Sequence, residues 1–298
     1  MNREKHLVLS DRRRLAYAEF GRPDGSPVLY FHGAPSSRLE PLLVGNDVWS
    51  RAGLRIIAPD RPGIGQSDFL PGRGFSDWPR DVTALADALG LKRFAVLGNS
   101  GGGPYAAVCA AKIPERLSAA VIVSGGWQMN LPEAKAGIPF VNRLFLGLAA
   151  HAPPLCRLML KAMGSSSVDD PEKELAKLKD RVPPADYAAF AKPGRIQALH
   201  EVMRECVRGG TKGAAWDLRL YMRPFDFELE EIRIPLKLYH GERDVQAPIA
   251  LVRRMVARLP SAQLVTYPDD SHLSTLCNHV EQLAEAIIHP ETGGGTLR

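Results

Sequence analysis

Short apolar runs alternate with amphipathic stretches across the first 126 residues of this 298-residue chain. The apolar runs lie at residues 28–31, 54–58, 94–97 and 119–123. Between the second and third runs, apolar residues recur at helical spacing on one face: Trp78, Val82, Leu85 and Leu89. Because continuous apolar runs are typical of strands buried on both faces, the pattern predicts a parallel sheet with helices on either side.

A hairpin is expected ahead of this sheet, because the polar residues 10–13 separate the strand-like runs 7–9 and 15–20. The strand–helix alternation stops near Trp127, and the chain is helix-like from there to about Glu231. Alternation then resumes, with strands expected at 236–239 and 264–267 and helical apolar periodicity after each.

This pattern predicts a division of the chain into three parts. Residues 1–126 and 232–290 form one core, residues 127–231 form a helical insertion, and the Gly-rich residues 291–298 form a disordered tail.

Composition and charge exclude several function classes. The chain is 45% hydrophobic and carries a net charge of +5, with basic residues interleaved among acidic ones rather than gathered in a stripe. We therefore predict no binding to nucleic acid or to an anionic membrane. No apolar stretch is long enough to span a bilayer and the N-terminus resembles no signal peptide, so a cytoplasmic location is expected. The four cysteines are far apart and indicate buried thiols rather than disulfides or a metal site.

A serine flanked by glycines stands between a predicted strand and a predicted helix. The segment reads Gly98-Asn99-Ser100-Gly101-Gly102 and follows the apolar run 94–97. This is the pattern of a nucleophile elbow, a turn too tight for side chains at its flanks, which leaves the serine hydroxyl exposed at the tip. Ser100 is therefore the candidate nucleophile.

A serine nucleophile needs a histidine base, which a carboxylate in turn holds in one tautomer. His272 follows the predicted strand 264–267, and Asp244 follows the predicted strand 236–239. Both therefore lie in loops at the C-terminal ends of strands, which is where open α/β sheets bind their ligands. The chain order Ser100, Asp244, His272 is the order expected after such an elbow. Three acidic residues near the same loops compete with Asp244 for this role: Glu242, Asp269 and Asp270.

Backbone N–H groups are expected to bind the oxyanion that develops during acyl transfer. Gly101, directly after the serine, supplies one candidate. The second candidate is Ala34 in the segment His32-Gly33-Ala34-Pro35, since Pro35 has no N–H and this loop follows the strand 28–31.

Taken together, these segments resemble the α/β-hydrolases that carry a lid. The resemblance also rests on residues 60–67, Asp-Arg-Pro-Gly-Ile-Gly-Gln-Ser, a tight loop after a strand. It implies a mostly parallel, doubly wound eight-stranded sheet with a helical cap inserted after the sixth strand. It also implies acyl transfer through Ser100, His272 and Asp244. No organic cofactor or metal is expected, because the chain has no HExxH, no phosphate loop and no GxGxxG at a first strand–helix unit.

The resemblance narrows the activity to cleavage of a carboxylic ester, thioester or lactone of a small, apolar substrate. A serine at position 100 argues against the relatives that use an aspartate nucleophile. Prolyl aminopeptidases usually have a glycine-richer loop than the one around Ala34, and carbon–carbon hydrolases usually have tryptophan where this chain has Leu273. Both activities remain alternatives, as do a non-catalytic small-ligand binder and an interaction module that acts through an apolar lid surface; a homodimer is left open.

The insertion is expected to set specificity, as loops on a conserved scaffold do. Six residues are candidates for substrate contact in the lid and around the serine: His32, Gly33, Asn99, Trp127, Phe140 and Phe145.

Overall fold

In the computed structural model, which describes residues 4–165 and 170–290, the strands form one eight-stranded sheet with the order β1-β2-β4-β3-β5-β6-β7-β8. The pairs β1–β2 and β2–β4 are antiparallel, and all the pairs beyond them are parallel. The strands are β1 Lys5–Val8, β2 Arg14–Gly21, β3 Ser26–Phe31, β4 Leu54–Pro59, β5 Phe94–Asn99, β6 Leu117–Val123, β7 Leu236–Gly241 and β8 Ala262–Tyr267. The predicted α/β-hydrolase fold is confirmed.

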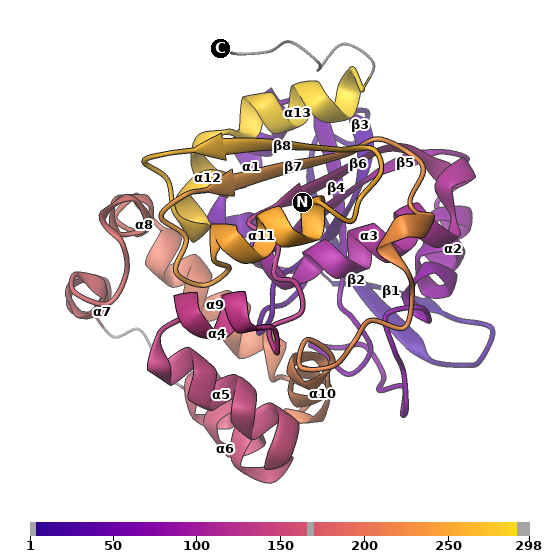
Figure 1. Ribbon diagram of the computed structural model, residues 1–298. Coiled ribbons are helices and arrows are strands. Elements are labelled where there is room, and N and C mark those ends of the chain that lie inside the picture. Colours follow the sequence, from indigo (N-terminus) through magenta and orange to yellow (C-terminus); the bar gives the residue numbers. More distant parts are fainter. Residues whose placement is uncertain (1–3, 166–169, 291–298) are drawn as a thin grey trace.

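Both faces of the sheet are covered because successive side chains of the central strands point to opposite sides. In β5, Phe94 and Val96 belong to one apolar cluster, whereas Ala95 and Leu97 belong to the other. The first cluster includes residues of α2, α3 and α11, and the second includes residues of α1, α12 and α13. Figure 1 shows these helices on the two sides of the twisted sheet. Their bounds are α1 Asn46–Arg51, α2 Trp78–Ala88, α3 Gly103–Lys112, α11 Ile249–Val256, α12 His272–Asn278 and α13 Val280–Ile288.

Helices occupy most of the chain between β6 and β7. They are α4 Pro132–Gly137, α5 Phe140–His151, α6 Pro153–Gly164, α7 Pro171–Leu178, α8 Pro184–Phe190, α9 Arg195–Cys206 and α10 Lys212–Leu220. The prolines that interrupt the helical pattern at 153 and 184 start α6 and α8, where the missing N–H has no intrahelical acceptor to lose. Figure 1 shows α5 and α6 at the end of the molecule away from the sheet.

The predicted cap therefore coincides with a run of helices, while its exact limits at 127 and 231 stay a prediction. The expected disordered tail, 291–298, lies outside the described residues. None of the described helices is both long enough and apolar enough to cross a bilayer.

The turn between β5 and α3 is as tight as its glycines indicate. Ser100 adopts a φ of 50°, in the left-handed region that residues with a Cβ rarely occupy. A Cβ on Gly98 would lie 2.4 Å from the carbonyl oxygen of Gly102, and a Cβ on Gly102 would lie 1.9 Å from that of Phe31. Short 3-10 turns complete the described elements: η1 Glu40–Leu43, η2 Ser100–Gly102, η3 Pro114–Arg116 and η4 Leu229–Glu231.

The Gly102→Ala substitution tests this close approach. Because the added methyl group meets backbone atoms that no side-chain rotation can move, we expect the free energy of unfolding to fall by about 2–4 kcal/mol in urea titrations. Gly147→Ala in α5 is the matched control, since nothing lies within 4 Å of the position that its added methyl group would take. That change should raise stability by about 0.5–1 kcal/mol through helix propensity. Equal effects at the two positions would contradict the packing described here.

Candidate active site

Ser100 lies at a cavity of about 220 Å³ between the sheet and the helices inserted after β6. The cavity is lined by Ala34, Pro35, Ser100, Gly101, Gly126, Met129, Asn142, Phe145, Leu146, Met163, Leu218, Tyr221, Gln246 and Ala247. No Asp, Glu, Lys, Arg or His is among these lining residues. The cavity is therefore uncharged, with two amide side chains and one phenol as its polar groups besides the serine.

His272 and Asp244 lie in hydrogen-bond contact, with 2.7 Å between Nδ1 of the imidazole and Oδ2 of the carboxylate. Asp244 follows β7, and its Oδ1 accepts hydrogen bonds from the backbone N–H groups of Gln246 and Ala247 at 2.7 and 2.9 Å. Burial opposes ionisation of Asp244, but the neighbouring His272 outweighs it and holds the pKa below its usual range. Burial likewise disfavours the imidazolium of His272, but Asp244 outweighs it and raises the pKa of His272 above its usual range.

The three competing carboxylates are engaged elsewhere. Glu242 pairs with Arg253, Asp269 pairs with Arg243, and Asp270 accepts from Asn278 and contacts the His279 ring at 2.6 Å. Of the four acidic residues considered for the imidazole, only Asp244 is placed against it by the structure.

One short segment after β6 holds both the serine turn and the histidine loop. The N–H of Gly126 donates to the carbonyl oxygen of Ser100 at 2.8 Å, and the hydroxyl of Ser124 donates to that of His272 at 2.8 Å. This segment fixes the backbones of the two residues relative to each other. Within the described residues, no hydrogen bond joins the Ser100 hydroxyl to the His272 ring.

The loop after β3 packs against the serine turn. A Cβ on Gly101 would lie 2.9 Å from the nitrogen of Ala34, and one on Gly33 would lie 3.6 Å from the Ser100 Oγ. The N–H of Gly33 donates to Glu40. By contrast, the N–H of Ala34 has no acceptor among the described residues. Ala34 and Gly101 thus border the cavity side by side.

The six predicted substrate contacts are not all at the cavity. Phe145 lines it, but Phe140 lies outside it and is 68% exposed. Trp127 is fully buried in the larger apolar cluster and does not line the cavity.

The three remaining candidates, His32, Gly33 and Asn99, are also absent from the residues that line the cavity. His32 is fully buried, and burial together with the nearby Arg61 lowers its pKa well below the usual range. Asn99 donates to Glu40 at 2.8 Å, and Gly33 forms part of the loop backbone.

A family model of the alpha/beta hydrolase fold matches residues 26–276. The chain belongs to the alpha/beta hydrolase family.

Similarity to individual members of the family is distant but spans most of each chain. A bifunctional esterase/perhydrolase of Acinetobacter calcoaceticus is 25% identical over 291 residues, covering 90% of this chain and 92% of that protein. A 2-hydroxymuconate semialdehyde hydrolase of Pseudomonas putida is 25% identical over 272 residues, covering 89% and 86%. The solved structure of a thermophilic esterase from Thermogutta terrifontis, 21% identical with 96% of both chains covered, superposes with a TM-score of 0.64 and shows the fold.

Sequence reasoning missed a set of buried charges around the site of this hydrolase. Asp186 of α8 is 1% exposed, and its Oδ1 accepts from the N–H groups of Leu273 and Ser274 at 2.9 Å each, at the start of α12. Asp217 of α10 pairs with Arg61 and Arg73 at 2.7 and 2.8 Å. Arg61 in turn donates to the carbonyl oxygen of Gly33 at 2.7 Å, so this cluster holds the loop that carries Ala34.

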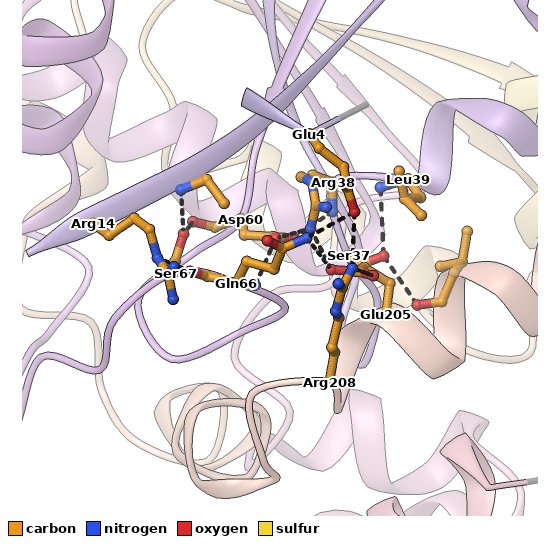
Figure 2. A network of polar contacts seen from close by, with 12 residues as sticks. Glu4, Arg14, Ser37, Arg38, Leu39, Asp60, Gln66, Ser67, Glu205 and Arg208 are labelled. Atoms are coloured by element: carbon orange, nitrogen blue, oxygen red, sulfur yellow. Dashed lines mark hydrogen bonds and ion pairs between the residues drawn. The ribbon is translucent and has the colours of Figure 1, made fainter. Parts of the chain in front are cut away.

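A third buried carboxylate from the insertion, Glu205 of α9, contacts Arg38 (Figure 2). Arg38 also donates from its backbone N–H and its guanidinium to Asp60, each at 2.6 Å. Burial raises the pKa of Asp60 to about 6 despite the attraction of Arg38. Among the described residues, no group of three His, Cys, Asp or Glu side chains is placed to hold a metal ion.

The raised pKa of Asp60 predicts a pH-dependent stability. Between about pH 4 and pH 6 the folded chain keeps a proton on Asp60 that the unfolded chain has released, so stability is lost as the pH rises through this range. We expect the free energy of unfolding of the wild type to fall by about 1–3 kcal/mol relative to Asp60→Asn between pH 4 and pH 7. Urea titrations at each pH measure this difference, with Asp47→Asn on the exposed surface of α1 as the control. Parallel pH profiles for wild type and Asp60→Asn would contradict the assignment.

Proposed function

We propose that this hydrolase cleaves carboxylic esters, or the related thioesters and lactones, of small uncharged substrates through an acyl-enzyme on Ser100. The observation that carries the proposal is the Asp244–His272 contact, together with a serine held at a φ of 50° at the edge of an uncharged cavity. The esterase activity named for the Acinetobacter calcoaceticus relative supports the reaction class.

In this mechanism the Ser100 Oγ attacks the acyl carbonyl while His272 accepts the hydroxyl proton. Asp244 holds Nδ1 of the imidazole and stabilises the imidazolium that forms. The N–H groups of Ala34 and Gly101 bind the oxyanion of the tetrahedral intermediate. His272 then protonates the leaving alcohol, and a water molecule hydrolyses the acyl-enzyme with the same proton transfers in reverse. The scheme requires a hydrogen bond between the Ser100 hydroxyl and the His272 ring in the substrate complex.

The uncharged lining favours ester cleavage over two related activities. The substrate named for the Pseudomonas putida relative, 2-hydroxymuconate semialdehyde, carries a carboxylate, and an aminopeptidase must accept a charged amino terminus. A buried carboxylate or ammonium group without a partner costs several kcal/mol. The cavity offers neither a cation nor an anion, so both the carbon–carbon hydrolase and the prolyl aminopeptidase are weaker candidates.

A series of p-nitrophenyl esters from acetate to palmitate tests the proposal. We expect turnover by the wild type and covalent labelling by a fluorophosphonate, and a loss of about 10³-fold or more in kcat/KM together with loss of labelling in Ser100→Ala. Urea titrations of both proteins control for folding. We also expect p-nitrophenyl butyrate to be preferred over p-nitrophenyl hydrogen succinate by at least about tenfold, because only the second places a carboxylate in the cavity.

Two results would overturn the proposal. One is a folded wild type that neither labels nor hydrolyses any ester of the series. The other is a Ser100→Ala variant that keeps both ligand affinity and biological activity, which would favour a non-catalytic binder on the same fold.

The raised pKa of His272 predicts the acid limb of the pH profile. His272 must be neutral to accept a proton, so kcat/KM should fall as the pH drops through a value above the ordinary histidine pKa of about 6.5. The charged and titratable groups that act on the ring are Asp244, Asp186, Glu40 and His240. Asp186→Asn removes one negative charge but keeps an oxygen that accepts from Leu273 and Ser274.

We therefore expect Asp186→Asn to move the acid limb to lower pH. Asp269→Asn is the control, because Asp269 is close to His272 in sequence but pairs with Arg243 on the exposed surface. An unshifted limb in Asp186→Asn, or an equal shift in Asp269→Asn, would show that Asp186 acts only as a structural cap of α12.

A further inference from the structure

Large apolar side chains are exposed mainly on two neighbouring helices, α5 and α6. Of the nine large hydrophobic residues exposed in the described part of the chain, six belong to these helices. Five of them define what we call the α5–α6 face: Phe140, Val141, Leu144, Leu155 and Leu158. Their exposures range from 47% to 68%, and the two helices pack against each other. In Figure 1 the pair forms the end of the molecule farthest from the sheet.

The α5–α6 face is not the side of these helices that packs on the rest of the protein. Asn142, Phe145 and Leu146 of α5 line the cavity at Ser100, and Cys156 and Leu160 of α6 are fully buried. The apolar residues on the outer side therefore contribute little to the core. A concentration of large exposed apolar side chains on one pair of packed helices points to a binding surface in a soluble protein.

The Lys and Arg residues of the segment that carries the α5–α6 face are not balanced by acidic ones. Residues 134–168 contain no Asp or Glu, but they contain Lys135, Arg143, Arg157 and Lys161. All four basic residues are exposed. Arg143 donates to the carbonyl oxygen of Lys135, and Arg157 to the hydroxyl of Thr211. Within the described residues, no carboxylate oxygen lies within 4.0 Å of the nitrogen atoms of these four cations.

We propose that the α5–α6 face docks on the surface of an anionic lipid bilayer. Exposed apolar side chains on a segment whose acidic and basic side chains are all basic match the boundary between acyl chains and negatively charged headgroups. A second copy of the chain is a poorer occupant, because a two-fold contact through this face would bring the same four cations together. The even spread of charge over the whole chain predicts no anionic membrane as a partner, but the segment 134–168, which carries this face, departs from that average because its Lys and Arg residues are not balanced by any Asp or Glu.

Vesicle binding by the full-length protein tests the proposal without reference to catalysis. Co-sedimentation with vesicles of phosphatidylcholine and phosphatidylglycerol is compared with pure phosphatidylcholine, in low salt and in 0.5 M salt. We expect partition into the anionic vesicles to be at least about tenfold stronger than into neutral ones, and to weaken at high salt by screening.

Two double variants separate the apolar and ionic contributions. Leu144→Ser with Leu158→Ser and Arg143→Gln with Lys161→Gln should each lower the partition coefficient by about tenfold or more. The matched control is Val8→Ser with Val265→Ser, which removes exposed apolar residues from β1 and β8 and should leave partition unchanged. All the replaced side chains are exposed, and urea titrations confirm that the variants fold.

Three outcomes would overturn the proposal. The first is absence of binding to either type of vesicle. The second is equal loss of binding in the Val8/Val265 control. The third is a lipid-free dimer in analytical ultracentrifugation that Leu144→Ser with Leu158→Ser dissociates, which would assign the face to a second copy of the chain.

Discussion

The candidate site depends on a close approach between two pieces of backbone: the loop after β3 and the turn that starts α3. A Cβ on Gly102 would meet the carbonyl oxygen of Phe31 at 1.9 Å, and one on Gly101 would meet the nitrogen of Ala34 at 2.9 Å. Because backbone packing sets these separations, the position of the Ala34 N–H relative to the backbone of Ser100 does not depend on a side-chain rotamer. Donors fixed in this way need no reorganisation when negative charge develops, which is the property that electrostatic stabilisation of an oxyanion requires.

The helices inserted after β6 are joined to this rigid centre by buried carboxylates. Asp186 binds the start of α12, which begins at His272. Asp217 binds Arg61, whose guanidinium holds the carbonyl oxygen of Gly33. Glu205 binds Arg38, which also holds Asp60. Removing one partner of a buried ion pair typically costs about 3–5 kcal/mol, so the Asp217–Arg61 and Glu205–Arg38 pairs tie the insertion firmly to the rest of the protein. The insertion is thus both a wall of the cavity and a support for residues on the opposite side.

Local sequence patterns predict those features of the fold and the site that are determined by residues close together in the chain. The strands and the serine turn follow from apolar periodicity and glycine spacing, whereas Asp244 and His272 are candidates because each follows a predicted strand in the chain order expected after the elbow. The partner of Asp186 lies 87 residues away and that of Glu205 lies 167 residues away, so no periodicity connects them. The sequence does not reveal that Phe145 lines the cavity while Phe140 is exposed, because α5 carries apolar residues on both its outer and its inner side. A helix of that kind has no single hydrophobic face from which its orientation could be predicted.

The two sides of α5 differ instead in charge, and this difference bears on the substrate. Arg143 of α5 is exposed, while the residues of α5 that line the cavity are Asn142, Phe145 and Leu146, none of them charged. A carboxylate substrate would be attracted to the exterior but would lose its hydration inside the cavity with no cation to replace it. For a neutral apolar ester, transfer out of water is favourable in free energy both at a lipid acyl-chain surface and inside the cavity. The proposed lipid surface and the proposed uncharged substrate therefore rest on separate observations and call for the same kind of molecule.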